Sequence, residues 1–241
     1  MGTVVSLDVP DPNAALVPWD DIEAVFSDAD ARFSLYRPDS ELSQINAGRG
    51  KITDGSVQVR ASYELASEWR IRTGGAFSPT RPDGVLDLNG VVKALAMRDA
   101  GALLADAGCQ DWTLAVGGDL LTSGTRPGGG GWLTGIIDPA HRAELLCAVE
   151  LRDGHRAVAT SGSAERGDHI WNTGAAPTFV QVSVLAEDIL TADVLATAIV
   201  AGGEPTLRDA CARWAIDVLT VDAAGGLTAT AGFRSLLASN G

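Results

Sequence analysis

The sequence predicts an α+β fold built as one domain. Segments with the 3.6-residue apolar spacing of helices alternate irregularly with short strand-like segments, and no regular series of strand, helix and strand units follows. The chain has 241 residues, of which 46% are hydrophobic and 20% charged. This composition allows a substantial core. We therefore expect a single domain over residues 1–241, with two interlocked lobes as the other possible arrangement.

The first half of the chain is predicted to be mainly helical. Residues 3–9 alternate like a strand, and a helix is expected to begin near Pro18 and continue through PWDDIEAVFSDADARFSLY. The polar segment RPDSELSQINAGRG should be an exposed connection. A second helix is expected over residues 57–74, where paired glycines suit a helix C-cap. A short strand and a long helix ending at Gly108 are expected in GVLDLNGVVKALAMRDAGALLADAG.

The second half of the chain is predicted to be rich in strands. They are expected in WTLAVGGDLLTSG, with its glycines at a bend, and in WLTGIIDP, LCAVELRDG, RAVATSGSAER and FVQVSVLAED. The segment ILTADVLATAIVAGG, residues 189–203, is expected to be a helix. Another helix in TLRDACARWA and a hairpin in DVLTVDAAGGLTATAGF complete the chain.

Charge and composition exclude several classes of protein. The formal net charge of −13 disfavours attraction to nucleic acid or anionic lipid. Three widely spaced cysteines, Cys109, Cys147 and Cys211, match neither a disulfide framework nor a zinc ligand pattern. No run reaches the roughly 18 apolar residues of a membrane span, and the first ten residues lack the features of a signal peptide. We expect a cytoplasmic protein without nucleic-acid binding or membrane insertion.

One carboxylate lies inside the apolar helix expected over residues 189–203. Asp193 and Thr197 are four residues apart, so their side chains share a helix face. A carboxylate and a hydroxyl oxygen suit a hard cation such as Mg2+ better than zinc. The alternative is an ordinary helix start, with Thr191 as N-cap and Asp193 stabilised by the helix dipole.

Two turns between predicted elements carry polar groups that could face a ligand. In LDLNGVVKALA, Asp87 and Lys93 flank a turn formed by Asn89 and Gly90, although a simple salt bridge would explain the charges. In AVGGDLLTSG, the paired glycines would let a ligand approach the backbone, with Asp119 as a hydrogen-bond acceptor. An ordinary hairpin turn explains this second segment equally well.

Two further segments are candidates for binding or catalysis. In ATSGSAERGDHIWN an apolar strand leads into small hydroxyl side chains and then to His169, which could serve phosphoryl chemistry. A structural histidine is the alternative. Tyr36 lies in a polar loop, where its ring could stack on a planar cofactor or simply pack at a rim.

Eight blocks in the same order resemble one family, the FAD:protein FMN transferases of the ApbE family. The resemblance extends from Met1 to about Gly203. Its blocks are MGT at 1–3, FSLYRPDSELSQIN at 33–46, TGGAFSPT at 73–80, LDLNGVVKALA at 86–96, VGGDLLTSG at 116–124, GIIDP at 135–139, AVATSGSAERGDHI at 157–170 and ADVLATAIVAGG at 192–203.

The resemblance implies a T-fold-related α+β architecture, with a mixed sheet, flanking helices and a cofactor cleft between lobes. FAD would be the substrate, and Mg2+ near its pyrophosphate would assist attack by a Thr or Ser hydroxyl of an acceptor flavoprotein, releasing AMP. The implied metal ligands are Asp193, Thr197 and a main-chain carbonyl, most plausibly that of Gly90. His169 is the implied base. The implied cofactor-site residues are Tyr36, Ser40, Glu41, Phe77, Thr80, Lys93, Gly117, Gly118, Asp119, Ser161 and Gly162.

The chain also departs from the family pattern around the expected cleft. GAFSPT stands where GAFDPT is usual, LNGVVKA replaces LGGIAKG, SGSAER replaces SGDYER, and the Asp-Pro pair after the histidine is missing from HIWNTGAAP. Three alternatives to flavin transfer therefore stay open. They are hydrolysis of FAD to FMN and AMP, action on a small molecule or another nucleotide, and flavin binding without catalysis.

Overall fold

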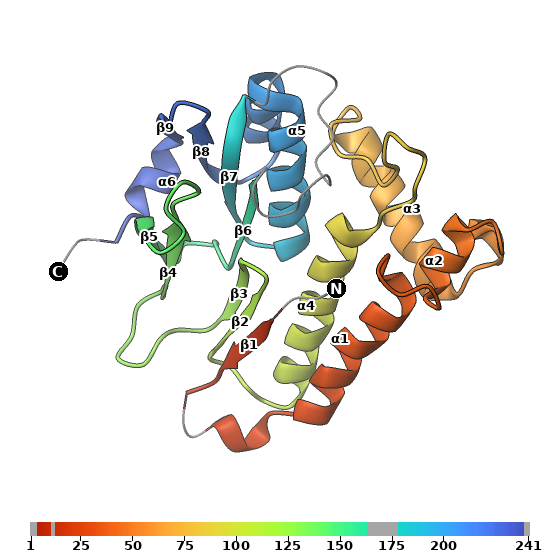
Figure 1. Cartoon of the computed structure of the whole chain (residues 1–241). Coiled ribbons are helices and arrows are strands. Elements are labelled where there is room, and N and C mark those ends of the chain that lie inside the picture. The colour runs from red at the N-terminus through yellow and green to blue at the C-terminus, as the bar shows by residue number, and fades with distance from the viewer. Residues whose placement is uncertain (1–3, 11–12, 163–177, 239–241) are drawn as a thin grey trace.

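A seven-stranded antiparallel sheet forms the centre of the protein, as the computed structural model shows for residues 4–10, 13–162 and 178–238 (Figure 1). Its strands lie in the order β1, β2, β3, β6, β7, β8, β9. Their bounds are Val5–Asp8, Trp112–Val116, Asp119–Ser123, Ala157–Gly162, Phe179–Ala186, Asp217–Asp222 and Leu227–Ala229. The α+β prediction is confirmed, but every described pairing in this sheet is antiparallel, so the sheet is not mixed in strand direction.

A second, two-stranded sheet is inserted between β3 and β6. It consists of β4, Trp132–Ile137, and β5, Leu145–Leu151. Together with the short helix α6, Ala231–Ser235, it covers one face of the central sheet. Side chains of Val158, Leu185 and Leu219 from that face share a buried cluster with Phe233 of α6.

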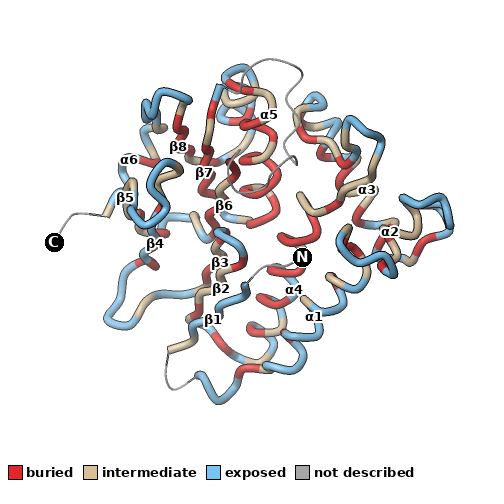
Figure 2. The backbone as a smooth tube through the Cα atoms, viewed as in Figure 1, coloured by how far each residue is buried: buried red, intermediate tan, exposed pale blue. Residues whose placement is uncertain are grey.

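Helices cover the other face of the central sheet in two layers (Figure 1). The inner layer consists of α4, Asn89–Asp106, and α5, Ile189–Arg213, which contact each other and the sheet. The outer helices α1, Trp19–Phe33, and α3, Val57–Arg72, pack on α4. Short helical segments lie at Asn13–Leu16 and Ile52–Asp54, and α2 covers Glu41–Asn46. Figure 2 shows that buried residues concentrate in α4, α5, β6 and β7, where the larger core lies.

The helix α5 begins at Ile189, as predicted, and is longer than its predicted first segment. Its N-cap is Asp188, whose carboxylate accepts a hydrogen bond from the Thr191 backbone N–H at 3.0 Å, so Thr191 is not the N-cap. The two predicted helices, residues 189–203 and the segment TLRDACARWA, follow each other within α5 and are separated by a kink. At the kink, Gly203 has φ 64°, a conformation that glycine adopts at low cost, and Pro205 follows.

Two sequence predictions about the first half are wrong. The segment RPDSELSQINAGRG is not only an exposed connection, because it contains α2 with Leu42 fully buried. A single buried side chain in a short helix gives no apolar period, which is why the pattern did not reveal it. The short strand expected before α4 is reduced to an isolated bridge between Thr80 and Leu86.

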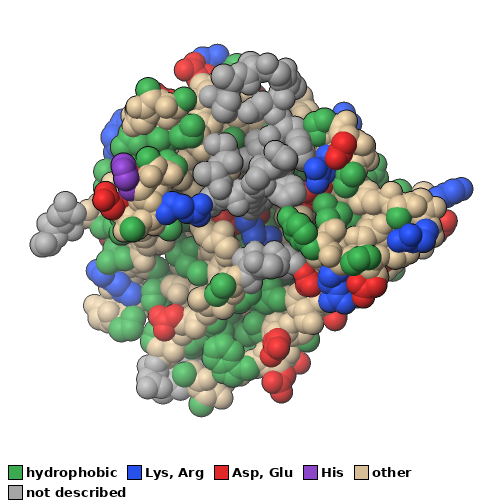
Figure 3. Space-filling model, viewed as in Figure 1, with side chains coloured by type: hydrophobic (Ala, Val, Ile, Leu, Met, Phe, Trp, Pro, Cys, Tyr) green, Lys and Arg blue, Asp and Glu red, His purple; other side chains and the backbone are tan. Residues whose placement is uncertain are grey.

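The surface agrees with the acidic but mixed composition of the chain. The face drawn in Figure 3 carries acidic and basic side chains that are interspersed rather than separated. Within the described part of the chain, none of the helices combines the length and apolar character needed to cross a membrane.

Candidate active site

A buried cluster of three charged side chains lies where α4, α5 and β3 meet. The Lys93 ammonium contacts the Asp119 carboxylate and also lies 3.4 Å from Asp193 Oδ2. Both carboxylates are fully buried, and the Lys93 side chain is only 9% exposed. Within this cluster of described residues, one ammonium faces two buried carboxylates. Buried carboxylates are stable only when they are paired or hydrogen-bonded, and the ammonium supplies part of that compensation.

The local sequence explains how each charge reaches this position. Asp193 lies in the first turns of α5, on a helix whose neighbouring residues are almost all apolar and buried. Lys93 lies in the first turns of α4, where the Asp87 carboxylate accepts from the Asn89 backbone N–H at 3.0 Å. Asp87 therefore orders the start of the helix, and Lys93 pairs with acids from other elements.

The paired glycines of AVGGDLLTSG form the turn of a tight β-hairpin. Val116 of β2 pairs with Asp119 of β3, which leaves Gly117 and Gly118 as the two central residues, with φ values of 55° and 90°. A two-residue turn with positive φ at both positions has the right twist to join antiparallel strands. The hairpin places Asp119 at the start of β3, where Asp119 Oδ1 accepts from the Thr160 N–H at 3.2 Å.

A hydroxyl group from β6 continues the polar site one turn further along α5. Ser161 Oγ lies 3.1 Å from Thr197 Oγ1 in a hydrogen bond for which either oxygen can be the donor. When Thr197 donates, its lone pairs remain able to bind a cation. Gly162 follows at the end of β6, where an added Cβ would lie 2.9 Å from the Val180 carbonyl oxygen. The structure thus places Ser161 beside α5 and Gly162 beside β7.

Two of the predicted metal ligands offer oxygen atoms whose chemistry suits a hard cation. Asp193 and Thr197 offer a carboxylate and a hydroxyl one turn apart on α5. Gly90 lies one turn before Lys93 on the same face of α4, the face that contacts Asp193. Among the described residues, no group of three or more His, Cys, Asp or Glu side chains is arranged to hold a metal. A cation here would therefore bind one carboxylate and neutral oxygens.

The aromatic ring of Phe77 packs directly against Gly90. A Cβ at Gly90 would lie 2.7 Å from Phe77 Cε2, so only glycine allows this contact. Phe77 is 3% exposed and belongs to the main core. Phe77, a predicted cofactor-site residue, is therefore a core residue that packs against the first turn of α4.

Four other predicted site residues belong to the outer helical layer and its loops. Tyr36 is 75% exposed in the connection between α1 and α2. Ser40 is fully buried as the N-cap of α2, donating to the Ser34 carbonyl at 2.6 Å. The Glu41 carboxylate accepts from the Ser56 N–H, and Thr80 is exposed in the loop before α4. These hydrogen bonds of Ser40 and Glu41 hold α2 in place.

Comparison with known proteins decides the family. The sequence model of the ApbE family matches residues 1–83 and 80–219. This protein belongs to the ApbE family. It is 31% identical over 231 residues to an FAD:protein FMN transferase of Rhodobacter capsulatus, which covers 90% of this chain and 40% of that protein. An FAD:protein FMN transferase of Chlamydia trachomatis is 25% identical, with 78% of this chain and 77% of that protein covered.

Solved structures of ApbE proteins share the fold. The flavin transferase ApbE from Vibrio cholerae superposes with a TM-score of 0.78 at 22% identity, covering 98% of this chain and 96% of the other. The ApbE protein from Thermotoga maritima gives a TM-score of 0.77 at 20% identity, with 98% and 94% covered. Since these identities are low, the likeness establishes the architecture alone. The chain spans less than half the length of the Rhodobacter capsulatus relative.

One predicted catalytic residue of this ApbE-family protein lies outside the described residues. His169 falls between Gly162 and Thr178, the ends of the described segments on either side. Its role as a base therefore stays a prediction.

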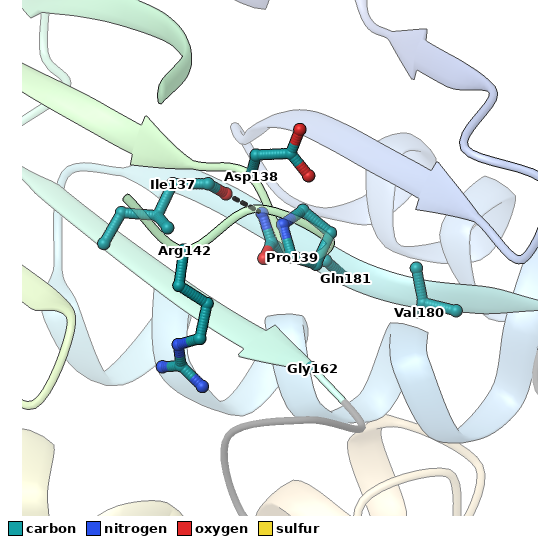
Figure 4. Close-up of a pocket in the computed structure, with 7 residues that line it drawn as sticks. All are labelled: Ile137, Asp138, Pro139, Arg142, Gly162, Val180 and Gln181. Atoms are coloured by element: carbon teal, nitrogen blue, oxygen red, sulfur yellow. Dashed lines mark hydrogen bonds between the residues drawn. The ribbon is translucent and has the colours of Figure 1, made fainter. Parts of the chain in front are cut away.

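A small hollow beside the end of β6 is lined by Gly162, a predicted cofactor-site residue, and by residues of the GIIDP segment. Figure 4 shows its lining residues, Ile137, Asp138, Pro139, Arg142, Gly162, Val180 and Gln181. The buried Gln181 amide donates to the Ile137 carbonyl at 2.9 Å and so fixes the end of β4. The Ala140 N–H donates to Asp138 and holds the pKa of this carboxyl below its usual value. Asp138 is therefore ionised at neutral pH.

Proposed function

We propose that this protein transfers FMN from FAD to a Thr or Ser hydroxyl of an acceptor protein, releasing AMP, in a reaction that depends on Mg2+. One observation carries the proposal. The ApbE-family match includes α4, β3, β6 and α5, the elements that bring Lys93, Asp119 and Asp193 together. The names of the two curated relatives support FAD as the donor.

In this proposal the residues around the charged cluster bind the metal and the phosphates. Asp193, Thr197 and the Gly90 carbonyl would hold Mg2+, which when bound neutralises charge on the pyrophosphate. Ser161 and Gly162 would lie near the phosphates, because Ser161 contacts Thr197. The glycines of the β2–β3 hairpin would allow close approach of the nucleotide to the backbone.

The remaining predicted residues would serve the flavin and the acceptor. Tyr36, which is 75% exposed, would contact the flavin or adenine ring. The acceptor oxygen would attack the FMN phosphorus, its proton would pass to His169, and the bond to the AMP oxygen would break. The product would be a phosphoester-linked flavin on the acceptor. A flavoprotein with a Ser/Thr motif would be the acceptor.

The test is incubation with FAD and Mg2+, with and without a peptide carrying the family's Ser/Thr acceptor motif. Mass analysis should show a peptide heavier by one FMN together with AMP. FMN and AMP formed equally without peptide would instead establish hydrolysis, and intact FAD in both samples would refute catalysis on this substrate.

A variant pair connects this activity to the buried cluster. Asp193→Asn should abolish product formation, because it removes the carboxylate proposed to bind the cation. Asp209→Asn is the matched control on the same helix, since Asp209 forms an exposed ion pair with Arg213 at 2.9 Å. Full activity of Asp193→Asn would contradict the proposed metal site.

A further inference from the structure

Lys93 lies between two acids that come from different elements and have different neighbours. Asp119 is fixed by the Thr160 N–H at the start of β3, whereas Asp193 belongs to α5. The ammonium contacts Asp119 more closely than it contacts Asp193, from which it is separated by 3.4 Å. A cation that binds Asp193 therefore competes with an ammonium that already has a second carboxylate within reach.

From this arrangement we propose that Lys93 is an internal counter-ion of Asp193 that Mg2+ displaces, and that Asp119 is a positioning residue that holds the displaced ammonium. The inference rests on the proposed metal-dependent function of the same site and assigns a separate role to each residue. Lys93 limits Mg2+ affinity. Asp119 raises that affinity without binding the metal itself.

The charges of the cluster explain these opposite effects. With Asp119 present, the ammonium keeps a carboxylate partner when a cation binds Asp193. With Asp119→Asn, Lys93 would keep only Asp193 as an acid within this cluster, and Mg2+ would have to separate a buried ion pair, which is unfavourable. Without the Lys93 charge, Mg2+ would bind Asp193 without a competing ammonium.

Titration with Mg2+ alone, in the absence of FAD, tests the proposal by isothermal titration calorimetry. Replacing supporting partners of metal ligands typically changes metal affinity by about 10–100-fold. Asp119→Asn, which keeps the size of the side chain and an oxygen for the Thr160 N–H, should weaken Mg2+ binding within that range. Lys93→Met should strengthen it, on the order of tenfold. Arg98→Met on the same helix is the control, because Arg98 pairs with Asp188 at the surface, and it should leave the affinity unchanged.

The double variant distinguishes a positioning role from direct ligation by Asp119. If Asp119 acts only through Lys93, then Asp119→Asn should lose its effect in the Lys93→Met background. An equal loss of affinity in both backgrounds would show that Asp119 binds the metal directly and would overturn the proposal. Unchanged affinity in Lys93→Met would also overturn it, as would a parent protein that binds no Mg2+.

Two further measurements distinguish a change in Mg2+ affinity from loss of the fold and from failure of the proposed function. Circular dichroism of each variant identifies loss of the fold, and Asp119→Asn with Arg98→Met keeps the comparison possible should Lys93→Met unfold. The flavin transfer assay is separate. Mg2+ affinities that follow the expected order without any FMN transfer would support the counter-ion role and refute the transferase. FMN transfer with equal Mg2+ affinities in all variants would support the transferase and refute the counter-ion role.

Discussion

Gly90→Ala is the substitution for which the structure gives the most detailed expectation. The new Cβ would lie 2.7 Å from Phe77 Cε2 and 3.1 Å from Cζ, whereas carbon atoms in favourable contact are about 3.5–4.0 Å apart. The ring must move, and because Phe77 is 3% exposed it can do so only by displacing other core atoms.

The expected magnitude is the difference between two effects. Overpacking a core costs about 1–3 kcal/mol. Alanine in a helix is more favourable than glycine by up to about 1 kcal/mol. We therefore expect Gly90→Ala to lower the free energy of unfolding by about 1 kcal/mol, within a range of roughly 0 to 2 kcal/mol.

Urea unfolding followed by tryptophan fluorescence measures this change, and Phe77→Leu supplies the decisive background. With the ring removed, Gly90→Ala should be neutral or stabilising, which gives a coupling of about 1 kcal/mol or more between the two positions. Identical effects of Gly90→Ala in both backgrounds would refute the contact on which the reasoning depends.

Three further predictions concern backbone strain, helix capping and thiol reactivity. Gly118→Ala should lower the free energy of unfolding by about 1–2 kcal/mol, because φ is 90° at this turn position; an unchanged urea midpoint would contradict this. Ser40→Ala should cost about 1–2 kcal/mol and increase hydrogen exchange in α2, and protection equal to the parent would disprove the capping role. Burial raises the pKa of the Cys147 and Cys211 thiols, and the Asp217 carboxylate raises that of Cys211 further. Since the thiolate reacts, iodoacetamide labelling of both should reach its midpoint at higher pH than a free cysteine peptide, and a lower midpoint would be evidence against this.

Elements with a strong local pattern could be predicted from the sequence. The helix predicted over residues 57–74 matches α3. Its apolar spacing and the paired glycines at its end are local signals that need no contact with the rest of the chain. The hairpin in DVLTVDAAGGLTATAGF matches β8 and β9 for the same reason. The glycine pair before Asp119 likewise forms a local turn that needs positive φ. The ApbE resemblance was carried by the order of such segments, and the family match confirms it.

The α+β class, most elements and the family could be inferred without the structure, because they depend on local periodicity and on the order of motifs. The packing of helices on the sheet was needed to show that Lys93 pairs with Asp119 and Asp193, and that the Asp87 carboxylate accepts from the Asn89 N–H at the start of α4. Side chains far apart in the chain meet only when helices pack on a sheet, and no spacing rule specifies which acid an ammonium will contact. The helix α2 could not be predicted for the same reason, because its one buried residue, Leu42, is buried only as part of the main core.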